Sequence, residues 1–66
     1  MRNKITHIKT NEAGNSYLVK KENKPVAVII EIYVSETPCI VIHVDNSLKD
    51  KSFYTLTQAL VYAEKL

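Results

Sequence analysis

Residues 25–44 read PVAVIIEIYVSETPCIVIHV, two apolar runs joined by the short polar segment Ser35–Pro38. In each run, β-branched side chains recur at every second position, which is the spacing of one face of an extended strand. The stretch therefore predicts two central strands of a sheet, joined by a reversal. The side chains expected to face the core are Val26, Val28, Ile30, Ile32, Val34, Ile40, Ile42 and Val44.

The same reversal predicts a pairing register for the two strands. A four-residue connection that ends in Pro38 favours a turn over a helix, because proline restricts the backbone and lacks an amide donor. The expected pairs across this hairpin are Val34 with Ile40, Ile32 with Ile42, Glu31 with His43 and Tyr33 with Val41. A glutamate opposite a histidine is weak support for acid–base chemistry when no nucleophile or metal site accompanies it.

The other face of these two strands is also rich in apolar residues. A sheet face that contacts water normally alternates with polar positions, yet about half of this face is apolar. One interpretation is a contact surface for a second subunit or another protein. The other is that central strands simply have high β-propensity. The residues predicted to bind a partner are Ile29, Glu31, Tyr33, Val41 and His43.

The flanking segments predict more strands and turns. The segments 4–10 and 16–21 are rich in good strand formers, and residues 52–54 are a candidate short fifth strand. The only glycine, Gly14, predicts a reversal between the first two strands, because glycine tolerates positive φ angles. Asn23 is the predicted left-handed residue of the next hairpin turn.

A helix is predicted for residues 56–66. Thr55 and Gln58 match the capping box that opens many helices. The apolar positions follow helical spacing and form one stripe, which is expected to dock on the Val28, Ile30, Ile32, Ile40 and Ile42 face. That stripe consists of Leu56, Ala59, Leu60, Ala63 and Leu66. The predicted fold is α+β, a four- to five-stranded antiparallel meander with one C-terminal helix packed on one face.

The 66 residues are expected to form a single small domain over positions 1–66. A core of this size is marginal and normally needs disulfides, a metal or oligomerisation. Cys39 is the only cysteine, so it has no partner within the chain. No metal site, cofactor or catalytic group is expected, because no C-x-x-C, phosphate-binding glycine or nucleophile motif is present. Oligomerisation is the remaining source of stability.

The expected location is the cytoplasm, and no association with a membrane is predicted. One cysteine and no secretory leader are typical of a reducing compartment. The longest nearly apolar run, residues 26–34, contains Glu31 and is too short to span a bilayer.

The predicted function is a small non-enzymatic protein-interaction module. It would regulate or inhibit a larger protein, in the manner of many phage and mobile-element chains, and would form a homodimer through an apolar sheet face or an edge strand. The alternative is a non-specific single-stranded nucleic-acid-binding protein, since six of the nine basic residues lie within residues 1–24. The residues predicted for that alternative are Tyr17, Lys20, Lys21 and Lys24. The other interpretation of these lysines, which we favour, is that they protect exposed strand edges from aggregation.

Overall fold

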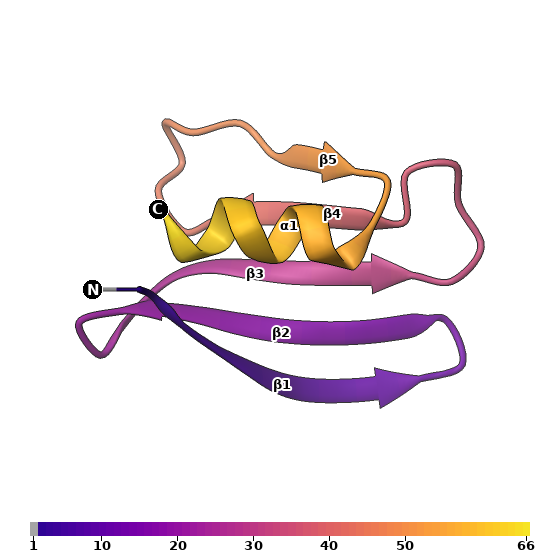
Figure 1. Ribbon diagram of the computed structural model, residues 1–66, viewed down its shortest axis with the longest axis horizontal. Coiled ribbons are helices and arrows are strands. Elements are labelled where there is room, and N and C mark those ends of the chain that lie inside the picture. Colours follow the sequence, from indigo (N-terminus) through magenta and orange to yellow (C-terminus); the bar gives the residue numbers. More distant parts are fainter. Residues whose placement is uncertain (1) are drawn as a thin grey trace.

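The computed structural model describes residues 2–66, which form five strands and one helix (Figure 1). All neighbouring strands are antiparallel and follow chain order, and the helix lies across one face of the sheet. The predicted α+β meander with a C-terminal helix is therefore confirmed. The elements are β1 (Lys4–Asn11), β2 (Gly14–Lys21), β3 (Lys24–Ile32), β4 (Cys39–His43), β5 (Lys51–Phe53) and α1 (Leu56–Glu64).

Two residues with positive φ close the β2–β3 hairpin. Asn23 has φ 69°, as predicted, and Glu22 has φ 51°. Two successive positive φ angles give the backbone twist that a two-residue hairpin loop requires. A bulge follows, because Val19 lies opposite Ala27 while Lys20 lies opposite Pro25.

Gly14 begins β2, and its role is to make space. The turn before it is closed by the Asn11 side chain, whose Oδ1 accepts hydrogen bonds from the amides of Ala13 (2.9 Å) and Gly14 (3.1 Å). A Cβ atom on Gly14 would lie 1.7 Å from the carbonyl oxygen of Glu31 on β3. Only glycine fits this close approach of two backbones.

The helix covers the face that the sequence predicted to be open. Ala27, Ile29, Cys39 and Val41 are fully buried, whereas Ile42 is 38% exposed. The prediction that the helix packs on the Val28, Ile30, Ile32, Ile40 and Ile42 face is therefore wrong. Val26 does pack against the core. It is the extra residue of the bulge in β3, so its side chain points to the helix side of the sheet instead of the side that strict alternation predicts.

The reason for this choice of face is side-chain size. The helix contributes Ala59 and Ala63 to the interface, both fully buried, and the sheet contributes the small residues Ala27 and Cys39 beside Val19, Ile29 and Val41. Small residues on both sides let the helix backbone lie close to the sheet, so that few voids remain. The predicted helical stripe is confirmed, since its three leucines pack partly buried around the two alanines.

The β3–β4 register differs from the prediction by four residues. Ile30 pairs with Ile40, and Glu31 pairs with Cys39 instead of His43. The connection is longer than predicted because β3 ends at Ile32. The amide of Tyr33 still donates to the carbonyl of Ala13 (2.9 Å) in the β1–β2 turn, which continues the β2–β3 pairing one residue beyond the end of β3. The predicted pairs Val34–Ile40, Ile32–Ile42, Glu31–His43 and Tyr33–Val41 do not form.

The helix begins as predicted and ends two residues early, at Glu64. Thr55 Oγ1 accepts a hydrogen bond from the Gln58 amide (3.2 Å), which is half of the capping box. The Gln58 side chain reaches one residue further back, where its Oε1 accepts from the Tyr54 amide (3.1 Å). At the other end, the Asn3 side chain donates to the carbonyl of Ala63 (2.9 Å) and fixes the last turn near β1.

Candidate protein-interaction surface

The face of the sheet opposite the helix carries six aliphatic side chains from three neighbouring strands. Residues directly opposite one another in a sheet share a face, and the observed register places these six together. Ile42 is 38% exposed, and the other five are half-buried. We call this surface the open face. Its members are Leu18 of β2, Val28, Ile30 and Ile32 of β3, and Ile40 and Ile42 of β4.

Polar side chains lie at the margins of the open face. The row through Ile30 and Ile40 ends in Ser52 on β5 and continues through Ser16 to Lys9 on β1. The row through Val28 and Ile42 ends in Thr6 on β1 in the same way. An apolar centre with a polar rim is the usual anatomy of a protein–protein interface.

The residues predicted to bind a partner do not form an exposed surface. Ile29 and Val41 are fully buried beneath the helix, and His43 is only 7% exposed. Of the five, Tyr33 alone is clearly exposed, at 53%, and Glu31 is half-buried. The prediction that these five side chains share an open face is wrong, because the helix covers that face.

His43 contacts the helix instead of Glu31. Its Nε2 lies 2.6 Å from the Tyr62 hydroxyl, and the two rings meet edge to face with centroids 5.7 Å apart. The ring of Phe53 on β5 also packs against Tyr62, with the two ring centroids 5.3 Å apart. His43 Nδ1 is buried and has no hydrogen-bond partner among the described residues. The histidine therefore anchors the helix to β4.

Glu31 belongs to a network of hydrogen bonds at the far end of the helix-covered face. The Asn15 side-chain amide donates to Glu31 Oε1 and to the Tyr33 hydroxyl, both at 2.8 Å. Thr10 in turn donates to Asn15 Oδ1 (2.7 Å). The network links β1, β2 and the end of β3, so these polar groups are held by one another.

The thiol of Cys39 is protected from ionisation. Burial raises its pKa above the ordinary value, and the negative charge of Glu31 adds to the effect. A nucleophilic cysteine needs a lowered pKa and access to solvent. Cys39 is fully buried, so the geometry supports a packing role.

The residues predicted for nucleic-acid binding lie in two separate places. Tyr17 is half-buried against the core, and its ring lies 5.3 Å from that of His7. Lys21 and Lys24 pair at the exposed β2–β3 tip. Four residues of strand, about 13 Å, separate Tyr17 from Lys21. The structure does not place an exposed aromatic ring among these lysines.

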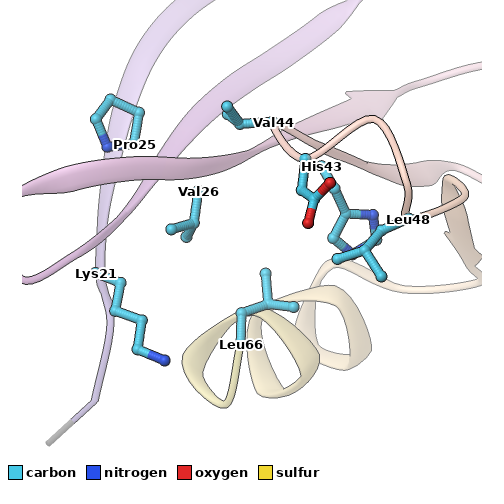
Figure 2. A pocket seen from close by; sticks show the side chains of 8 residues that line it. Lys21, Pro25, Val26, His43, Val44, Leu48 and Leu66 are labelled. Atoms are coloured by element: carbon cyan, nitrogen blue, oxygen red, sulfur yellow. The ribbon is translucent and has the colours of Figure 1, made fainter.

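A cavity of about 350 Å³ opens between the β2–β3 tip, the end of β4 and the end of the helix (Figure 2). Its walls are mainly apolar, from Pro25, Val26, Val44, Leu48 and Leu66. In Figure 2 the side chain of Lys21 extends along one wall toward the last turn of the helix. A second, shallower groove lies over Phe53, Val61 and Tyr62.

Asp45, at the rim of the first cavity, is held by its own turn. Its Oδ1 accepts hydrogen bonds from the Ser47 amide (2.9 Å) and hydroxyl (2.8 Å). These bonds lower the pKa of the Asp45 carboxyl below its ordinary value. The carboxylate is thus engaged in closing the turn after β4.

Residues 2–66 offer neither a metal-ion site nor a membrane-spanning helix. That part of the chain contains no group of three or more histidine, cysteine, aspartate or glutamate side chains placed to hold a metal ion. It also contains no helix with the length and apolar character needed to cross a bilayer.

Comparisons with protein-family models, with curated proteins and with solved structures found no significant match to this chain. The open face is therefore identified from its geometry alone. Its members on β3 and β4 are part of the alternating set that the sequence predicted to face the core, and Leu18 was not predicted as a member. The missed signal was the presence of small residues on the opposite set, which match the alanines of the helix.

Proposed function

We propose that this protein is a small non-enzymatic interaction module that binds another protein surface through the open face. The observation that supports the proposal is the cluster of six aliphatic side chains on β2, β3 and β4, on the side away from the helix. Removing apolar surface from water favours a complex by about 25 cal/mol per Å², part of which is offset by the freedom lost on association. A partner with a matching apolar surface would gain that energy here.

A regulator or inhibitor of a larger protein is the form of this function that suits so short a chain. It would act in the cytoplasm, where a single buried thiol such as Cys39 stays reduced. Phage and other mobile elements are the proposed source of such a chain. Single-stranded nucleic-acid binding is the alternative proposal. The separation between Tyr17 and the lysines at the β2–β3 tip makes it the weaker of the two.

Capture of binding partners from an extract of producing cells tests the proposal. The bait is the purified chain, compared with an Ile42→Lys variant. Ile42 lies on the open face and is 38% exposed, so the lysine is tolerated by the fold while its charge blocks apolar docking. We expect bound protein to fall at least tenfold with Ile42→Lys.

The matched control is Val61→Lys on the outer side of the helix, where the side chain is 49% exposed. It adds the same charge away from the open face and should leave capture unchanged. Circular dichroism checks that both variants are folded. Equal capture by the wild type and a folded Ile42→Lys variant, together with the same solution mass for both, would show that the open face is not the contact surface.

A further inference from the structure

We infer that the partner on the open face is a second copy of this chain, so that two sheets pack face to face with one helix on each outer side. This inference rests on the proposed function, because it names the occupant of the same surface. It also commits to a geometry in which the two copies bury the same residues, which is the isologous contact of a two-fold dimer.

The exposed area of the chain supports an additional partner. A folded chain of 7.5 kDa exposes about 4,250 Å² on average. This chain exposes 4895 Å², an excess of about 650 Å². The excess belongs to the chain as a whole, and a dimer that buried an equal area on each copy would bury about 1,300 Å² in total, near the lower end of the range of specific protein interfaces, about 1,200–2,000 Å².

The shape of the open face favours a sheet over a helix as its partner. On the covered face, two of the five fully buried sheet residues, Ala27 and Cys39, are small and let the helix come close, and Val19, Ile29 and Val41 complete the cluster. The six residues of the open face are all leucine, isoleucine or valine, and none is small. Large side chains that stand on a twisted sheet instead interdigitate with those of another sheet, about 10 Å away and rotated by about 30°. A second copy supplies such a sheet with the same width and twist.

The placement of lysine selects one of the two ways to stack the copies. Lys9 stands at the β1 end of the central row, and Ser52 stands at its β5 end. A two-fold axis perpendicular to the strands would stack β1 on β1 and bring like charges together, which is unfavourable. An axis along the strands, above Ile30, stacks β1 of one copy on β5 of the other. Lys9 then faces Ser52 of the second copy.

The first test is the solution mass of the purified full chain by light scattering, from micromolar to millimolar concentration. We expect a dimer of about 15 kDa, twice the chain mass. Ile42→Lys should be a folded monomer, and Val61→Lys should remain a dimer. A wild type that stays monomeric at millimolar concentration overturns the inference, as does a dimer that persists in folded Ile42→Lys.

The second test determines which strands of the two copies lie over one another, and it does not depend on the stability of Ile42→Lys. Lys9→Cys and Ser52→Cys variants are mixed and treated with a short bis-maleimide. The expected product is the Lys9→Cys/Ser52→Cys cross-linked pair, in large excess over cross-links of either variant with itself. Wild type is the control, since its only thiol, Cys39, is buried. Self-cross-linked Lys9→Cys as the main product would overturn the proposed stacking.

These tests separate the inference from the proposed function. A monomeric wild type whose capture of another protein is lost in Ile42→Lys would refute self-association and leave the interaction module standing. A dimer that persists in folded Ile42→Lys, together with equal capture by both chains, would refute both.

Discussion

The two faces of this sheet are both apolar, and only one of them holds the helix. Val41 and Ile42 are neighbours on β4, yet Val41 is fully buried and Ile42 is 38% exposed. The covered face combines the aliphatic residues Val19, Ile29 and Val41 with the smaller Ala27 and Cys39, whereas the open face contains only large aliphatic side chains at its centre. The comparison teaches that the fit between small residues on helix and sheet, and not the number of apolar residues, decides which face becomes the core.

The largest expected effect comes from placing one charge on each face in turn. Val41→Asp would bury a carboxylate without a partner, which costs several kcal/mol. A chain of 66 residues has a total stability of about 3–10 kcal/mol. Val41→Asp should therefore be unfolded at 25 °C. Ile42→Asp should stay folded as a monomer, with a loss of about 1 kcal/mol from β-propensity in addition to the stabilisation that dimerisation provides.

Thermal melting followed by circular dichroism measures this pair. The two positions are adjacent on one strand, so the local backbone and the nature of the substitution are matched. A cooperative transition for Val41→Asp, or its absence for Ile42→Asp, would mean that the assignment of the two faces is reversed.

The same comparison explains how far the sequence could be interpreted. Alternation of period two separated the two sets of side chains correctly within residues 27–32 and 39–43, because neighbouring strand residues point to opposite sides, but it misplaced Val26 and included Val34, which lies beyond the end of β3. It could not say which set is covered, since both are apolar. That choice depends on packing against the helix, where Ala59 and Ala63 match Ala27 and Cys39.

Long-range contacts explain the errors in register. A shift of the β3–β4 register by four residues leaves the alternation within each strand satisfied, so only the pairing itself, with Ile30 opposite Ile40, fixes it. The bulge beside Val26 likewise arises from the pairing of β2 with β3, and it turns this one side chain toward the core. The helix cap and the turn at Asn23 depend on neighbouring residues, so their positions were predicted correctly.

A smaller effect should come from the polar contact within the covered face. Tyr62→Phe removes the hydroxyl that lies 2.6 Å from His43 Nε2, and leaves that buried nitrogen without its partner. The expected loss of stability is about 1–3 kcal/mol, measured by urea unfolding. The double variant His43→Leu with Tyr62→Phe should lose less than the sum of the two single variants, because it leaves no unpaired polar group. Additive losses would show that the contact contributes no coupling energy.

The smallest expected effect is a pH dependence that only the covered face can produce. Burial is the main cause that raises the pKa of Cys39 above 9.0 and that of Tyr17 above 10.0, and in both cases the charge of Glu31 adds to it. The unfolded chain ionises these groups at their ordinary values, while the folded chain keeps them neutral. Their contribution to stability is therefore complete below pH 9 and declines as the pH rises through the raised pKa values.

Urea midpoints measured from pH 8 to pH 11 test this difference between the faces. Cys39→Ala should remove the part of the decline that begins near pH 9 and leave the part from Tyr17, which begins near pH 10. The slope of the midpoint against pH is compared, because the substitution also changes packing. Ile42→Ala on the open face removes no ionisable group and should keep the wild-type slope. An unchanged slope in Cys39→Ala would mean that the thiol ionises equally in the folded and unfolded chains, and hence that β4 does not bury it beneath the helix.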